Sequence, residues 1–279
     1  MTTELGGTPD ARGANRAPAG RPLLHEWTPV AKSRARLRRA QTEEPGSMQH
    51  FSAALYLSDV ITKLHALTVI GLIEAFEQSA PSSLSFELAR ATSTGAWVGA
   101  LRDAVQRVNP GMLGNVSADE WIADLKTWLT QKRGRADEER LGDVLRPLAY
   151  LTERLSQQTG TREIGSRPRT PIDLMQIMVE IRNKTTGDHA YGSEFWSTSV
   201  QAIVAGADLL SRDSPLWSGS FVLPLERRGR AMVRLLEGVE PEQSVHVPAL
   251  ANDSGDSPWY MLVKTPVASL GELVWVKVA

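Results

Sequence analysis

Residues 48–76 constrain the fold most, because apolar side chains recur through the whole segment at intervals of three and four. Such spacing predicts a long helix with a wide apolar face. A helix that is apolar over much of its surface must be buried, so this segment predicts a helix inside a bundle or at a contact between subunits. Its apolar positions are Phe51, Leu55, Val60, Leu64, Leu67 and Ile70.

Further helical patterns occupy the chain up to Leu210. Apolar periodicity predicts helices within 84–108, 117–129, 141–155, 171–182 and 193–210. The helix that starts at Pro171 has the clearest beginning, since Thr170 is a suitable N-cap and Asp173 places a negative charge in the first turn. Ser93 likewise indicates a turn and an N-cap.

After Leu210 the pattern changes from helical to short β-type runs at 221–225, 230–236, 244–247, 259–264 and 273–278, separated by glycine- and aspartate-containing turns. We therefore expect an α+β fold, in which a mainly helical bundle is followed by a small antiparallel β domain. The expected organisation is a disordered tail at 1–22, a helical domain at 23–212 and a β-rich domain at 213–279.

Composition excludes several classes of function. The chain of 279 residues has no cysteine, which excludes disulfides, a thiol nucleophile and cysteine-ligated zinc. A net charge of −1 argues against a globally basic surface for nucleic acid. There is no apolar run near the roughly 20 residues that span a bilayer and no signal-peptide pattern at the start. We expect a soluble cytoplasmic protein with no cofactor, no metal and no membrane partner.

Side chains that could bind phosphate or transfer protons cluster where the helix at 171–182 ends. Arg182, Asn183 and His189 lie within eight residues of one another, with Lys184 between them. Arginine stays charged and binds phosphate through paired hydrogen bonds, while histidine exchanges protons near neutral pH. The structural alternative is that Arg182 and Asn183 only cap the helix and that His189 is a surface residue.

Two other groups of residues have both a structural and a functional interpretation. The run Lys32, Arg34, Arg36, Arg38 and Arg39 contains no acid and could bind phosphates, although such a run is more often the solvated face of a helix. Trp97, Trp121 and Trp128 could stack on bases, but their helical spacing favours a place in the core. His65 lies on the core-like helix, and its spacing from acidic residues predicts no metal site.

The order Arg182, Asn183, five residues and then His189, between two amphipathic helices, resembles the signature of the HEPN family. The sequence RNKTTG, which begins at Arg182, and the sequence STGAWV, which begins at Ser93, also resemble sequences of a bacterial subgroup of that family linked to defence systems. The resemblance covers residues 45–210. The chain departs from the family pattern in having Asp188 between the glycine and His189, and Ala190 after it.

The resemblance implies a small helical domain and a metal-independent endoribonuclease acting in bacterial defence or stress. It implies that two protomers face each other, so that two copies of Arg182 and His189 form one site at a dimer interface. His189 would act as base or acid, and Arg182 would stabilise the phosphorane. Asn183 would position the histidine or the phosphate, and Lys184 would bind substrate. RNA, a second copy and a partner protein of a defence system are the expected partners. The alternative function is a non-catalytic sensor or adaptor that binds a nucleotide or a protein.

Overall fold

The computed structural model describes residues 26–77, 93–111, 116–131, 170–185, 191–212, 214–218, 239–240 and the strand segments given below. The expected tail at 1–22, the expected helix at 141–155 and His189 lie outside the described residues. The domain boundaries expected at 22 and 212 stay predictions.

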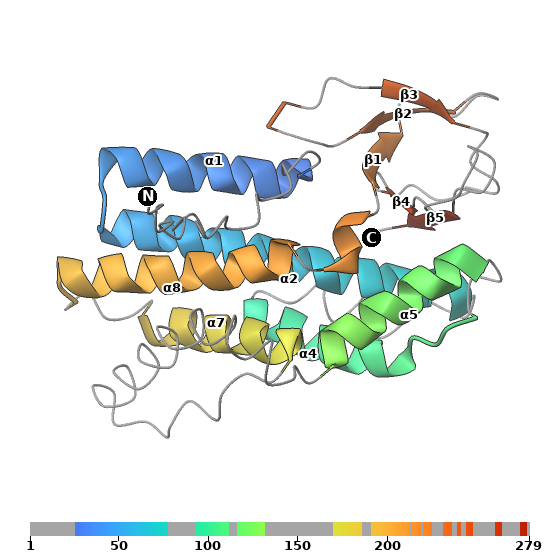
Figure 1. Ribbon diagram of the computed structural model, residues 1–279, viewed down its shortest axis with the longest axis horizontal. Coiled ribbons are helices and arrows are strands. Elements are labelled where there is room, and N and C mark those ends of the chain that lie inside the picture. Colours follow the sequence, from blue (N-terminus) through green and yellow to red (C-terminus); the bar gives the residue numbers. More distant parts are fainter. Residues whose placement is uncertain are drawn as a thin grey trace, which may run out of the picture.

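The described helices pack around one long central helix (Figure 1). This helix is α2, which spans Met48–Glu77. Helices α1, α4, α7 and α8 all contact α2. Their bounds, with those of α5 and of the short 3-10 helix η1, are α1 Thr28–Glu43, α4 Thr94–Arg107, α5 Val116–Thr130, α7 Pro171–Thr185, α8 Ser193–Arg212 and η1 Pro215–Ser218. The prediction of a buried central helix at 48–76 is therefore confirmed.

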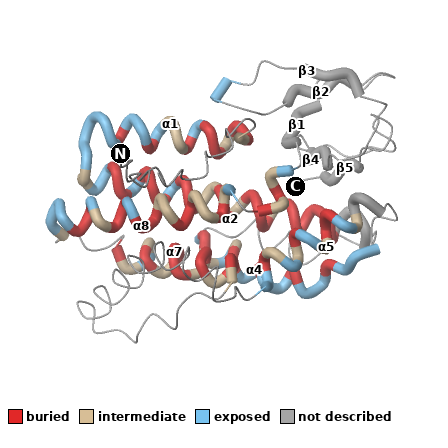
Figure 2. Tube along the Cα trace, viewed as in Figure 1, coloured by how far each residue is buried: buried red, intermediate tan, exposed pale blue. Residues whose placement is uncertain are grey.

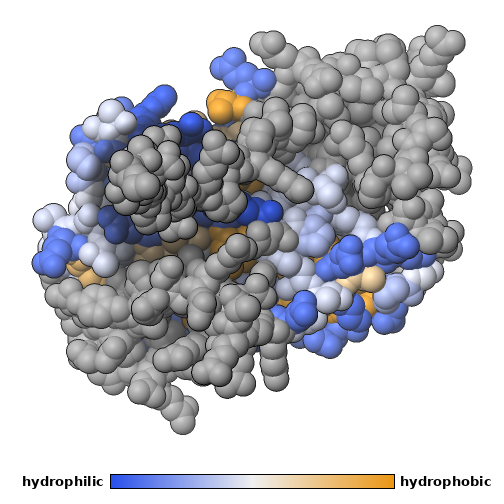
Figure 3. Space-filling model, viewed as in Figure 1, coloured by the Kyte–Doolittle hydropathy of each residue, from blue (hydrophilic) through white to orange (hydrophobic). Residues whose placement is uncertain are grey.

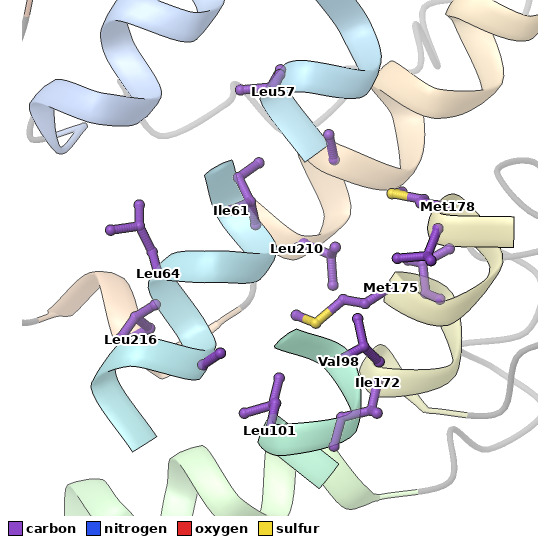
Figure 4. Close-up of a cluster of buried hydrophobic side chains, with 14 of the residues drawn as sticks. Leu57, Ile61, Leu64, Val98, Leu101, Ile172, Met175, Met178, Leu210 and Leu216 are labelled. Carbon is purple, nitrogen blue, oxygen red and sulfur yellow. The ribbon is translucent and has the colours of Figure 1, made fainter. Parts of the chain in front are cut away.

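The core lies where side chains from these helices converge on α2 (Figure 4). Leu57 and Ile61 of α2, Leu101 of α4, Met175 of α7 and Leu210 of α8 are all buried in one hydrophobic cluster. Removing so much apolar surface from water supplies the main favourable free energy of folding, at about 25 cal/mol per Å². Figure 2 shows the same pattern along the chain, with buried residues facing inward and exposed residues along the outer side of α1.

Local sequence explains where two of these helices begin. The backbone N–H of Asp173 donates to the Thr170 hydroxyl at 3.2 Å, and the N–H of Thr170 donates to the Asp173 carboxylate at 3.1 Å. This reciprocal cap satisfies two N–H groups that a helix start leaves unpaired. Ser93 caps α4 in the same position, accepting from the N–H of Ala96. Both caps agree with the sequence predictions.

α2 is long and apolar enough to cross a membrane by length and composition alone, over residues Met48–Ile73. However, 72% of its most apolar window is buried inside the molecule. A core helix of a soluble protein has these properties, and the burial of α2 is consistent with a soluble chain.

A cluster of aromatic rings connects α2 with α5 and η1, and His65 is its buried member. The His65 ring lies parallel to the Trp128 ring at 5.5 Å and edge-on to the Trp217 ring at 5.5 Å. His65 Nδ1 lies 2.8 Å from the carbonyl oxygen of Ile61, so Nδ1 donates and Nε2 accepts from the Ser214 hydroxyl at 2.9 Å. Burial lowers the pKa of His65 to about 4. His65 is thus a neutral core residue, as its position on the helix predicted.

The expected α+β fold class is wrong. The part of the chain described with its side chains is 86% helical and contains no strand. Only the backbone is described for the segments after η1 that have strand geometry, namely β1 Ser220–Pro224, β2 Ala231–Leu235, β3 Ser244–Val247, β4 Tyr260–Val263 and β5 Val274–Lys277. They pair antiparallel in the order β3-β2-β1-β4-β5. The part of the chain whose side chains the structure describes is therefore helical, and it is this finding that overturns the expected class.

Candidate functional site

Arg182 lies in the last turn of α7 and connects three helices. Its Nη1 is 2.6 Å from Oδ2 of Asp59 in α2 and donates to Oγ1 of Thr94 in α4 at 2.5 Å. The sequence prediction that Arg182 only caps its own helix does not describe this geometry, because these partners belong to other helices. The guanidinium is therefore held in one position by groups that the fold brings together.

Asp59 is a carboxylate in a mostly apolar setting. Its side chain is 14% exposed, and burial raises the pKa of the Asp59 carboxyl above its ordinary value. The Arg182 charge, a hydrogen bond with Thr94 and the Lys63 charge each act in the opposite direction on that pKa. Arg182 thus supplies the positive charge that makes an ionised carboxylate tolerable at this place.

A groove of about 240 Å³ opens beside this ion pair. It is bounded by residues of α1, α2, α7 and α8, so its walls come from the beginning, middle and end of the helical region. Both apolar and polar side chains line it. The lining residues are Arg36, Met48, Phe51, Ser52, Leu55, Tyr56, Asp59, Arg182, Thr185 and Trp196.

Part of the groove lining is exposed apolar surface, whereas the described helices bury most of their large apolar side chains. Tyr56 is 46% exposed and Met48 is 41% exposed, whereas Phe51, Leu55 and Trp196 are buried. The guanidinium of Arg36 lies over the Tyr56 ring, 4.9 Å from its centroid. A stacked arginine and tyrosine form a flat surface with a positive charge, which suits planar and anionic ligands.

The remaining predicted site residues have different outcomes. Asn183 is exposed on α7. Lys184 is half-buried, and its enclosed Nζ has no hydrogen-bond partner among the residues that the structure describes. His189 and Asp188 lie outside the described residues, so the distance between Arg182 and His189 stays a prediction. Among the described residues, no group of three histidine, aspartate or glutamate side chains could hold a metal ion.

Sequence reasoning missed Asp59, Thr94 and Tyr56 as site residues. One signal was available for Asp59, because it is an acid within an apolar helix and such a residue usually has a charged partner. Tyr56 gave no comparable signal, since a single exposed aromatic residue on a helix is ordinary.

Comparisons with protein-family models, with curated proteins and with solved structures found no match for this chain. The resemblance to the HEPN family therefore rests on the residues quoted above.

Proposed function

We propose that this protein is a metal-independent endoribonuclease of the bacterial cytoplasm that acts in defence or stress. The observation that carries the proposal is the placement of Arg182, which is fixed by Asp59 and Thr94 at the edge of a groove. A preorganised cation stabilises charge that develops on a phosphorane without reorganising during the reaction. The proposal also rests on the resemblance of the Arg182–His189 segment to the HEPN signature.

The ion pair does not remove Arg182 from use. The Arg182 side chain is still 39% exposed, and it lines the groove. In this proposal Asp59 is a positioning residue, because it acts through the guanidinium and not on RNA. The guanidinium would contact a phosphate of the substrate, in the manner that arginine contacts phosphates generally.

His189 would supply the proton transfers. Cleavage without a metal needs a base that removes the proton of a 2′-hydroxyl and an acid that protonates the departing 5′-oxygen. One histidine in one chain provides one of these groups, so we propose a homodimer in which two copies of His189 share the work. Asn183 would position the phosphate or the imidazole. Lys184 would act on the substrate through its charge alone, because its Nζ is enclosed.

The test is RNA cleavage by purified protein in the presence of EDTA. We expect the wild-type protein to cut total or transfer RNA, and we expect Arg182→Ala and His189→Ala each to abolish cutting. His189→Ala should keep the thermal midpoint of the wild type, whereas Arg182→Ala should stay folded with a lower midpoint, because it leaves the Asp59 carboxylate without its partner. Arg107→Ala removes an arginine from the last turn of a different helix, α4, and serves as the matched control. Equal cleavage by all four proteins would end the proposal, and so would loss of activity with EDTA alone.

One observation favours a second function. Because Arg182 is held by a carboxylate and a hydroxyl, the groove presents a fixed cation even without a histidine. A non-catalytic sensor or adaptor that binds a nucleotide, and that passes the signal to a partner protein, would need no more. Saturable nucleotide binding with no RNA cleaved, under conditions where the protein is folded, would favour this alternative over the nuclease.

A further inference from the structure

The exposed face of α1 beside the groove is basic. Lys32, Arg36 and Arg39 follow one another at spacings of four and three, which places them on one side of the helix, and all three are exposed. Within α1 there is no acidic residue before Glu43. Figure 3 shows hydrophilic side chains over the part of α1 that is visible in that view. The chain is nearly neutral overall, so this face is a local concentration of positive charge.

Arg36 connects that face to the groove. Its guanidinium covers the Tyr56 ring, and no carboxylate in the described part of the chain forms an ion pair with it. Arg34, by contrast, is half-buried and is paired with Glu26 and Asp208. Arg34 therefore stabilises the packing of α1, whereas Arg36 is available to a ligand.

The groove has the size and chemistry of a site for one nucleotide. Its volume of about 240 Å³ lies just below the range of roughly 300 Å³ and upward that is usual for whole small ligands. Tyr56 stays 46% exposed although the Arg36 guanidinium lies over one face of its ring, and together with Met48 it provides apolar surface for a base. Arg36 from α1 and Arg182 from α7 provide guanidinium groups for phosphate from different walls.

We infer that this groove binds one nucleotide of single-stranded RNA, with the base against Tyr56 and the flanking phosphates at Arg36 and Arg182, while the rest of the strand follows the basic face of α1. A base can reach an aromatic side chain only when it is unstacked, which a duplex does not allow. The choice of RNA rests on the proposed function. The binding itself requires no cleavage.

The experiment measures fluorescence anisotropy of a labelled single-stranded oligoribonucleotide with the His189→Ala protein, in which the strand stays intact. On that background we compare Tyr56→Ala, Tyr56→Phe and Arg36→Ala. Arg38→Ala is the matched control, because Arg38 is an exposed arginine on α1 that does not line the groove. Thermal melting checks that each variant is folded.

We expect Tyr56→Ala to raise Kd by about fivefold to a hundredfold and Tyr56→Phe to stay within about twofold, because stacking needs the ring and not the hydroxyl. Arg36→Ala should raise Kd and lower the slope of log Kd against log salt by about 0.7. Arg38→Ala should have a smaller effect on Kd. Duplex RNA of the same sequence should compete poorly.

The inference is overturned if Tyr56→Ala binds like its parent, if Arg38→Ala weakens binding as much as Arg36→Ala, or if duplex RNA competes as well as the single strand. These outcomes are separable from failure of the nuclease. If the wild-type protein cuts RNA while Tyr56→Ala and Arg36→Ala change neither binding nor cutting, the nucleotide site is wrong and the nuclease stands. If binding depends on Tyr56 but the wild-type protein does not cut RNA, the nucleotide site stands and the nuclease is wrong.

Discussion

Arg182 of α7 and Asp59 of α2 form an ion pair of 2.6 Å at the edge of the groove. The two residues are far apart in the sequence. The charge of Asp59 depends on Arg182, and the position of the Arg182 guanidinium depends on Asp59. Without Arg182 the Asp59 carboxylate would be a half-buried charge with little compensation, and without Asp59 the guanidinium would not be fixed beside the groove.

The first prediction concerns the stability that this pair contributes. Arg182→Ala removes the cation and leaves the Asp59 carboxylate, which is 14% exposed, without that partner. We expect the free energy of unfolding to fall by about 1–2 kcal/mol in urea denaturation, a modest value because Arg182 is 39% exposed and water screens the pair.

Arg102 and Asp173 provide the matched control for this comparison. They are 4.0 Å apart, and their side chains are 50% and 43% exposed. Arg102→Ala should therefore change the unfolding free energy by no more than about 0.5 kcal/mol. If Arg102→Ala costs as much as Arg182→Ala, the special position of the Asp59 pair is refuted.

The second prediction tests the close approach of α4 and α7 that lets Arg182 reach Thr94. A Cβ atom added to Gly95 would lie 3.3 Å from Cγ1 of Val179, whereas one added to Gly99 would meet nothing within 4 Å. Gly99→Ala should stabilise the protein by about 0.5–1 kcal/mol through helix propensity. Gly95→Ala should gain less, and Gly95→Val should destabilise by about 1–3 kcal/mol. Thermal or urea unfolding of the three variants measures this, and an equal gain at both alanine sites would contradict it.

The third prediction concerns acid. Burial lowers the pKa of His65 to about 4 from an ordinary value of 6.5. The unfolded chain therefore binds a proton on His65 between those values while the folded protein does not, so stability is full above pH 6.5 and decreases as pH falls toward 4. The loss should reach about 3 kcal/mol at the lower end. Urea denaturation at pH 7.5 and pH 5 measures the change.

The His65→Leu variant tests whether His65 causes this pH dependence of stability. His65→Leu fills the same apolar surroundings without a titratable group, so its stability should depend less on pH than that of the wild type, whatever its stability at pH 7.5. His50→Gln is the companion variant, since burial lowers the pKa of His50 as well. A pH dependence that is unchanged in His65→Leu would show that other groups are responsible.

Much of the helical architecture could be predicted, because local chemistry determines it. Thr170, Pro171 and Asp173 define the start of α7 without reference to the rest of the chain. The apolar periodicity of α2 predicted its burial, and His65 and Trp121 are buried as expected from their helical positions. These signals depend on residues close together in sequence, so a single sequence contains them.

The site could be predicted only in part, because its contacts join distant segments. The sequence singled out Arg182 but not Asp59 or Thr94, and it could not show that Arg36 stacks on Tyr56. The β-type alternation after Leu210 predicted the positions of short strands but not the fold class, because alternation does not specify what covers an apolar face. The proximity of His189 to Arg182 stays a prediction.

The measurement that tests the central claim most directly compares the rates of RNA cleavage by variants at Arg182 and Asp59. We predict that Arg182→Ala abolishes cleavage and that Asp59→Asn lowers kcat by about tenfold with little change in KM, since a positioning residue acts through the guanidinium. Asp59→Glu should restore part of the rate, and the Arg182→Ala, Asp59→Asn double variant should match Arg182→Ala alone. Undiminished cleavage by Arg182→Ala, or an unchanged kcat in Asp59→Asn, would contradict this prediction.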